Sequence, residues 1–206
     1  MDDHPLATTD ETSAPPAAST LHLGSGALKV LAHPLRSRLL AALRIGGPAT
    51  ATALAGKLDT NTGATSYHLR RLAAVGLVEE TDAGRGRERW WRASSAAHSW
   101  TERDVAGDPD GEAASDWLRR SHLRTFVEGY EAWLTAKAGW SIEWREAADS
   151  SDFLVRVTPS GLAALLDEVR ALVERHRDPS PGDEGAEPVL VYVHALPLAA
   201  VREILP

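Results

Sequence analysis

Apolar residues at helical spacing define the first structured part of the chain. Between residues 26 and 45 they recur every three or four positions, which predicts helix. Pro34 lies inside this run and fits the first turn of a second helix better than the interior of one long helix. The sequence Gly46-Gly47-Pro48 then predicts the end of that helix. The apolar positions of the run are Leu28, Leu31, Leu35, Leu39, Leu40 and Leu43.

Two shorter helical patterns follow, and the second has a polar face. Residues 50–58 predict a short helix, and residues 59–61 predict a turn into a helix that Asn61 or Thr62 caps. Gly76 predicts the end of this second helix. Its apolar face consists of Thr65, Leu69, Leu72 and Ala73, and its polar residues are Ser66, Tyr67, Arg70 and Arg71. Two short helices joined by a tight turn predict a helix-turn-helix.

A basic hairpin is predicted directly after this helix. Leu77 and Val78 open a strand, and Trp90 and Trp91 belong to its partner. The turn between the strands places two cations, Arg85 and Arg87, at its tip. A helix with a polar, basic outer face suits the major groove of a duplex, and a basic hairpin suits the flanking phosphates.

These features resemble the ArsR-type winged helix-turn-helix of bacterial transcription regulators. The resemblance covers residues 26–93 and rests on the segments LAHPLRSRLLAAL, ATALAGKLDTNTGATSYHLRRLAAVGLVEE and GRGRERWWR. Its strongest motif is Ser-x-His-Leu-x-x-Leu-x-x-x-Gly-Leu-Val, which runs here from Ser66 to Val78. The resemblance implies a DNA-binding regulator that usually acts as a repressor. It also implies a helix after the wing that pairs two subunits into a homodimer.

The expected partner is double-stranded DNA with an inverted-repeat operator, read by two modules about one helical turn apart. His68 has two open interpretations, direct DNA contact or a hydrogen bond inside the module. Base readout by serine and tyrosine follows no simple code. The candidate DNA-binding residues are Asn61, Thr62, Gly63, Ser66, Tyr67, His68, Arg70, Arg71, Arg85 and Arg87.

The domain organisation predicts an α+β protein. The expected parts are a disordered tail (1–23), a winged helix-turn-helix domain (24–95), a linker (96–114), a dimerisation helix (115–138) and a small C-terminal α/β domain (139–206). By resemblance, the apolar stripe of residues 115–138 is assigned to the dimer interface, and packing within the chain is the alternative. The stripe consists of Leu123, Phe126, Val127, Tyr130, Trp133 and Leu134.

The C-terminal domain is expected to have the order strand, strand, helix, strand. The alternation of Trp140, Ile142 and Trp144 predicts a half-buried strand, and residues 153–157 repeat the pattern. Thr158 and Pro159 predict a helix start. Residues 189–194 predict a third strand. The helix is expected to bury Leu162, Leu165, Leu166, Val169, Leu172 and Val173.

Charge is unevenly distributed along the chain. The net charge is −7, which taken alone argues against nucleic-acid binding. Residues 27–95, however, carry 11 Lys/Arg and five Asp/Glu, whereas residues 96–206 carry 11 and 20. A basic module on an acidic body directs DNA to one side. The chain has no cysteine, no apolar run long enough for a membrane span and no secretory leader, so a cytoplasmic protein without membrane contact is expected.

The regulator is expected to respond, through its C-terminal half, to a non-metal effector or to a partner, and the possible effector is a small organic molecule. Trp117, Trp133, Trp140 and Trp144 suit an apolar pocket, although they equally suit an ordinary core. No metal site or cofactor is expected, because the chain lacks thiolates and residues 115–138 do not reproduce the family's metal-ligand spacing. No catalytic motif is present, so no enzyme activity is expected. The alternatives are a regulator without a ligand and a winged-helix adaptor for proteins.

Overall fold

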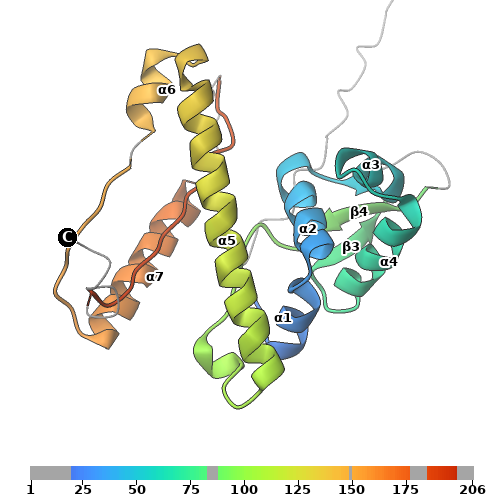
Figure 1. Ribbon diagram of the computed structural model, residues 1–206, viewed down its shortest axis with the longest axis horizontal. Coiled ribbons are helices and arrows are strands. Elements are labelled where there is room, and N and C mark those ends of the chain that lie inside the picture. The colour runs from blue at the N-terminus through green and yellow to red at the C-terminus, as the bar shows by residue number, and fades with distance from the viewer. Residues whose placement is uncertain (1–19, 83–87, 149, 177–184, 199–206) are drawn as a thin grey trace, which may run out of the picture. The chain divides into compact units, whose positions relative to one another are not determined.

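The computed structural model describes residues 20–82, 88–148, 150–176 and 185–198 (Figure 1). Its contacts divide the chain into two units, Met1–Thr125 and Phe126–Pro206. The first unit contains small sheets and several helices, and a long helix follows them, so the predicted α+β class is confirmed.

The first unit contains the predicted helices at the predicted places. Pro34 is the first residue of a separate helix, and the His33 ring caps it by accepting a hydrogen bond from the backbone N–H of Leu35 at 3.2 Å. Gly47 follows this helix with a positive φ of 73°, a conformation that glycine adopts without strain. The helices are α1 (Ser25–Leu31), α2 (Pro34–Gly46), α3 (Ala51–Lys57) and α4 (Thr62–Ala73).

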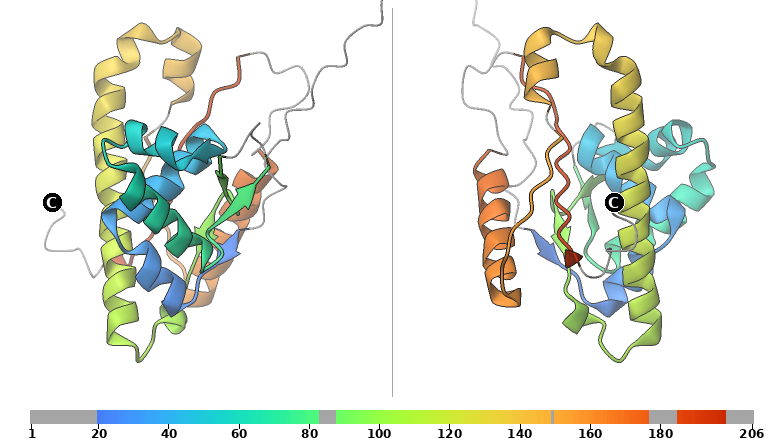
Figure 2. Two further views of the ribbon diagram at one scale, coloured as in Figure 1. Left: turned by 90° about the vertical axis from the view of Figure 1, so that its right-hand side faces the viewer. Right: turned by 60° about the vertical axis from the view of Figure 1, so that its left-hand side comes forward.

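A three-stranded sheet lies beside these helices. β3 (Val78–Thr81) and β4 (Trp90–Ala93) form the predicted antiparallel hairpin, with Val78 opposite Ala93 and Thr81 opposite Trp90. β2 (Ala49–Thr50) pairs with the other edge of β4 and gives the order β2-β4-β3. Figure 2 shows this hairpin next to α4 from a second side.

A second, smaller sheet corrects the expected limits of the tail and the linker. β1 (Leu21–His22) pairs in parallel with β5 (His98–Ser99), and Leu23 lies in the core. Residues 20–23 are therefore part of the folded unit, whereas residues 1–19 of the expected tail lie outside the described residues. The pairing joins segments more than 70 residues apart, so no local sequence pattern predicts it.

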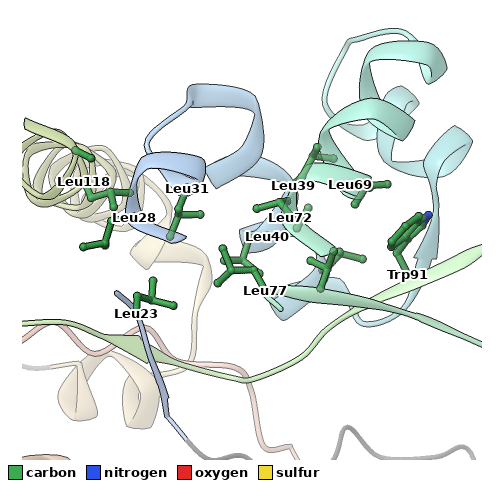
Figure 3. Packing of buried hydrophobic residues seen from close by; sticks show 14 of the residues in the cluster. Leu23, Leu28, Leu31, Leu39, Leu40, Leu69, Leu72, Leu77, Trp91 and Leu118 are labelled. Carbon is green, nitrogen blue, oxygen red and sulfur yellow. The ribbon is translucent and has the colours of Figure 1, made fainter. Parts of the chain in front are cut away.

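Leucine side chains from five elements form one core (Figure 3). Leu28 of α1 and Leu118 of the long helix α5 (Pro109–Ala136) are fully buried, as are Leu69 and Leu72 of α4. Each such side chain contributes about 2 kcal/mol by leaving water. The first part of α5 is thus packed into the same core as the helix-turn-helix.

Helix α5 begins six residues before the expected start at residue 115. The Asp108 carboxylate accepts a hydrogen bond from the backbone N–H of Gly111 at 3.2 Å and so caps the helix. Pro109 takes the first helical position, and Glu112 accepts from the backbone N–H of Gly107. Ser25 and Lys29 of α1 also donate to Asp108, and these hydrogen bonds hold the pKa of its carboxyl well below the usual range.

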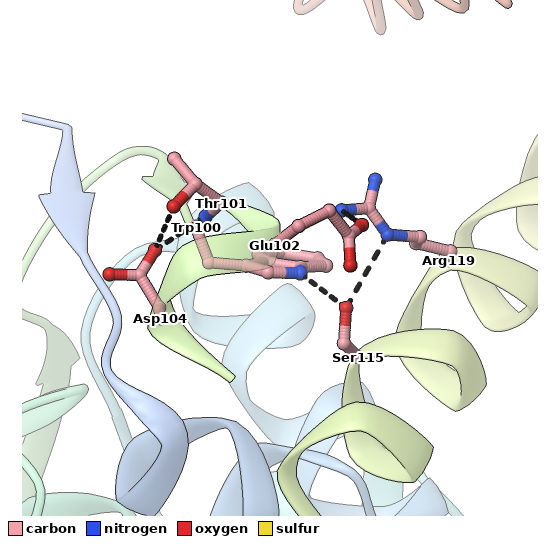
Figure 4. Close-up of polar contacts among 6 residues, drawn as sticks. All are labelled: Trp100, Thr101, Glu102, Asp104, Ser115 and Arg119. Atoms are coloured by element: carbon pink, nitrogen blue, oxygen red, sulfur yellow. Dashed lines mark hydrogen bonds and ion pairs between the residues drawn. The ribbon is translucent and has the colours of Figure 1, made fainter. Parts of the chain in front are cut away.

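A polar cluster attaches α5 to the segment after β5 (Figure 4). The buried Ser115 hydroxyl accepts hydrogen bonds from the indole N–H of Trp100 at 2.7 Å and from Arg119 at 3.4 Å. Arg119 also pairs with Glu102 of the short helix η1 (Glu102–Asp104), and its guanidinium lies over the Trp100 ring. Beside the cluster, Asp104 accepts from the backbone N–H and the hydroxyl of Thr101.

The stacked neighbour of Trp100 is His98, whose ring is held by Arg44 of α2. A guanidinium only donates, so the 2.6 Å contact from Arg44 makes His98 Nδ1 the acceptor and places the ring proton on Nε2. That buried Nε2 has no hydrogen-bond partner among the described residues. Burial, followed by the charges of Arg44 and His122, lowers the pKa of His98 to about 3.

The second unit differs from the predicted C-terminal α/β domain. Its elements are the end of α5, a short helix η2 (Lys137–Gly139), α6 (Ile142–Ala147) and α7 (Pro159–Arg175). Residues 153–157 and 189–194 form no strand within the described residues. The predicted start of α7 is confirmed, since the Thr158 hydroxyl accepts from the backbone N–H of Gly161. The predicted buried face of α7 is wrong, because no residue of that helix is buried.

The predicted strand at residues 140–144 is also wrong. Ser141 caps α6 by accepting from the backbone N–H of Trp144. Trp140 lies just before this cap and outside α6, and its ring contacts that of Trp144 with centroids 6.0 Å apart. An alternation of only three positions is too short to exclude a helix, and the serine cap shows that a helix begins here. No helix among the described residues is long and apolar enough to cross a membrane.

We predict that His98 makes the stability of the protein depend on pH. The fold favours the neutral ring, so this contribution is complete above the ordinary pKa of 6.5 and is lost as pH falls towards about 3. The free energy of unfolding should fall by about 2 kcal/mol more between pH 7 and pH 5 than in the His98→Asn variant. Urea denaturation of both proteins at the two pH values measures the difference. Parallel pH profiles would contradict the prediction.

Candidate nucleic-acid interface

A tight turn joins α3 to α4 and fixes the angle between them. Thr50 caps α3 by accepting from the backbone N–H of Ala53 at 3.1 Å. Asp59 in the turn has a φ of 52°, a left-handed conformation that aspartate tolerates better than most residues. The Asn61 side chain then accepts from the backbone N–H of Ala64 at 2.8 Å, so Asn61, and not Thr62, is the N-cap of α4.

Helix α4 has one buried face and one exposed face. Thr65, Leu69 and Leu72 are fully buried against the core, as predicted. The outer face exposes Arg70 and Arg71, along with Thr62 and Gly63 at the first turn. Tyr67, 53 % exposed, lies on the same face, and Ser66 is half-buried beside it. The helix therefore presents hydroxyl, phenol and guanidinium groups together to the outside.

A pocket of about 300 Å³ lies between α4, the start of α3 and the hairpin. Four hydroxyl side chains line it, and they come from two helices and a strand. Two guanidinium groups and one carboxylate complete its polar lining. The lining residues are Thr50, Ala51, Thr52, Thr62, Ser66, Arg70, Glu88, Arg89 and Trp91. Such a lining is rich in donors and suits an anion.

His68 faces the inside of the module. Its ring centroid lies 4.5 Å from that of His33, and its Nδ1 lies 3.5 Å from the guanidinium of Arg36. Tyr67 meets the ring edge-on at 5.1 Å. Burial, followed by the charges of His33 and Arg36, lowers the pKa of His68, which favours the neutral ring. The geometry supports the interpretation of His68 as a residue bonded within the module.

The predicted residues of the hairpin tip and of the dimer interface fall into three groups. Arg85 and Arg87 of the hairpin tip lie outside the described residues. Along α5, Leu123, Val127, Tyr130 and Leu134 expose between 37 % and 50 % of their surface. Phe126 and Trp133 of the same helix are half-buried.

The four tryptophans of the expected effector pocket have different surroundings. Trp133, Trp140 and Trp144 contact one another edge to face within the second unit, with neighbouring centroids 5.9 and 6.0 Å apart. Trp117 instead packs against the leucine core of the first unit. Trp117 is thus accounted for by core packing.

Thr50, Thr52, Glu88 and Arg89 are pocket residues that the sequence analysis did not select. Thr50 precedes a short helix, so its role as a cap was readable, but its position opposite α4 depends on the β2–β4 pairing. Arg89 lies next to Trp90 on the predicted hairpin, and the basic character of the hairpin was the available signal.

Helices α3 and α4, the turn between them and the β3–β4 hairpin define a winged helix-turn-helix. Residues 31–81 match the model of a family described as a helix-turn-helix domain. This match covers part of the chain and agrees with the helix-turn-helix that these elements form. No curated protein matches the chain.

Three solved structures resemble parts of the chain. One is a homodimeric winged helix-turn-helix DNA-binding domain from Mycobacterium bovis, described as a possible ArsR-family transcriptional regulator. Its identity is 22 %, its TM-score is 0.32, and the match covers 51 % of this chain and 77 % of that one. Another is a possible transcriptional regulator for arsenical resistance, with 28 % identity, a TM-score of 0.30 and coverage of 62 % and 98 %.

The third is a variant of Lactococcus lactis ZitR in its apo form, with 18 % identity, a TM-score of 0.29 and coverage of 73 % and 90 %.

We predict that Asn61 stabilises the domain through its cap. Asn61→Ala leaves the N–H of Ala64 without its side-chain acceptor and should lower the free energy of unfolding by about 1 kcal/mol. Asn61→Ser retains a capping oxygen and should stay near the wild type. Urea denaturation measures all three proteins. Equal stability of the alanine and serine variants would show that the cap contributes nothing.

Proposed function

We propose that this protein is a sequence-specific, DNA-binding transcriptional regulator of the ArsR type. The observation that carries the proposal is the division of α4. Its apolar face holds the helix in the core, and its exposed face presents Tyr67, Arg70 and Arg71. Helix α4 enters the major groove, and the hairpin contacts the flanking backbone.

The residues divide by role along α4. Ser66 and Tyr67 lie where base edges are reached, and Arg70 and Arg71 meet phosphate. Asn61, Thr62 and Gly63 form the first turn, where backbone N–H groups and the helix dipole favour a phosphate. His68 positions the helix through its contacts with His33 and Arg36. Arg85 and Arg87 are assigned by their position in the sequence to contacts with the DNA backbone.

The regulator acts as a homodimer that reads an inverted repeat. The exposed stripe of α5 supports this, because Leu123, Val127, Tyr130 and Leu134 are spaced four, three and four residues apart. That spacing places apolar groups on one side of a helix, as in a helix pair. The M. bovis domain that resembles this chain is itself homodimeric.

Control is exerted through the C-terminal half. The proposed effector is a small organic molecule bound near the contacting rings of Trp133, Trp140 and Trp144. Binding there changes how the two subunits pair and therefore the spacing of the two reader helices. The protein then represses its target when the spacing matches the operator.

The first experiment is a mobility-shift and footprint assay on the DNA upstream of the protein's own gene. Wild type should protect a palindrome, and binding should weaken steeply as salt rises. The double variant Arg85→Ala, Arg87→Ala should bind every duplex less tightly and lower the salt slope by about one to two units.

Each outcome of this assay has a distinct meaning. A palindromic footprint supports a specific dimeric regulator. An unchanged slope in the double variant removes the hairpin tip from the interface. No binding at any salt contradicts the DNA-binding proposal and favours a winged-helix adaptor for proteins.

The dimer interface is tested with one charged substitution on the α5 stripe. Val127→Glu places a carboxylate in the proposed apolar contact and should convert the dimer to monomer in sedimentation equilibrium at micromolar concentration. Ala132→Glu is the matched control, because residue 132 is exposed on the same helix and outside the stripe. A Val127→Glu protein that remains a dimer would show that the stripe is not the interface.

A further inference from the structure

The pocket between α4, α3 and the hairpin is lined mainly by hydrogen-bond donors, and one acidic side chain lies beside them. Arg70 and Arg89 reach it from two different elements, and Glu88 lies next to Arg89. Glu88 is exposed and lies shortly before the start of β4, on the side of the hairpin tip. Together the three side chains give the pocket a formal charge of +1, where the two arginines alone would give +2.

The other polar side chains of the pocket have hydrogen-bond donors that can bind a ligand. The Thr50 hydroxyl accepts from the N–H of Ala53, so its own proton is left to donate. Arg89 uses one nitrogen, Nη1, in a 3.0 Å pair with Glu80, and its remaining N–H groups are left for another acceptor. Thr52 and Thr62 add exposed hydroxyls. Among the described residues of the lining, only Glu88 is acidic.

We infer that this pocket receives one backbone phosphate of the duplex, and that Glu88 weakens its binding. The inference rests on the proposed function, because the sugar-phosphate backbone of the DNA crosses the pocket only if α4 lies in the major groove. The hydroxyls and the two guanidinium groups then contact the phosphate, while the Glu88 carboxylate repels it. Glu88 thereby limits the affinity that comes from the backbone alone.

This arrangement has a physical use for a regulator. Phosphate contacts carry no sequence information, yet they supply nearly all binding to random DNA. A genome offers a vast excess of random sites, so strong backbone binding would sequester the protein. A carboxylate inside a phosphate pocket lowers that background and leaves the complex more dependent on the contacts of Ser66 and Tyr67.

The test compares charge-neutral variants on a random-sequence duplex, so no operator is needed. Glu88→Gln should raise affinity at low salt by about fivefold and steepen the salt slope by up to one unit. Arg89→Gln should lower affinity by a similar factor and reduce the slope by about one unit. The loss of the exposed Arg89–Glu80 pair costs the fold little.

Two controls separate the pocket from the overall charge. Glu168→Gln on α7 and Arg103→Gln on η1 make the same changes of net charge at exposed positions elsewhere. Both should stay within about twofold of wild type, because screening confines charge effects to near neighbours. Fluorescence anisotropy over a series of salt concentrations gives the affinities and slopes of all five proteins.

The outcomes divide cleanly. Opposite shifts for Glu88→Gln and Arg89→Gln, with both controls unchanged, support the inference. Unchanged affinity in the two pocket variants overturns the inference, and so does weaker binding by Glu88→Gln. In either case the proposed function stands as long as the wild type binds DNA in a salt-dependent way. Wild type that binds no duplex at low salt overturns the proposed function, and the phosphate pocket with it.

Discussion

The structure of the winged helix-turn-helix, called the reader domain below, depends on burial of the inner face of α4. Leu69 and Leu72 are removed from water entirely, and this burial supplies apolar stabilisation to the helix. Because a helix turns once every 3.6 residues, fixing these two side chains also fixes where Tyr67, Arg70 and Arg71 point. Replacing either leucine with alanine would cost about 2–5 kcal/mol and loosen the orientation of the outer face.

Local signals were sufficient to predict the reader domain. Pro34, Asn61 and Gly76 mark element ends by backbone chemistry that needs no distant partner, and the period of the leucines identifies the buried faces. The outer face of α4 follows from the same period. The site was predictable to the extent that it lies on this one helix.

Features that depend on distant contacts were not predictable. The pairing of β1 with β5 and the Arg44–His98 contact join residues 54 or more positions apart. The start of α5 was placed too late because its Gly- and Pro-containing first turn looks like a linker until Asp108 is seen to cap it. The strand predicted at residues 140–144 rested on only three alternating positions, a run too short to distinguish a strand from the start of α6.

The burial of α5 is confined to one end. Gly111, Ala114, Ser115 and Leu118 are buried, and every described residue of the helix beyond Phe126, except Trp133, is exposed. The reader domain therefore holds the helix by its first turns, and the helix is about 40 Å long. If a molecule binds the outer turns and changes the affinity for DNA, linkage requires that DNA change the affinity for that molecule by the same factor. The affinity of the protein for its effector would then differ between molecules bound to an operator and molecules free in solution.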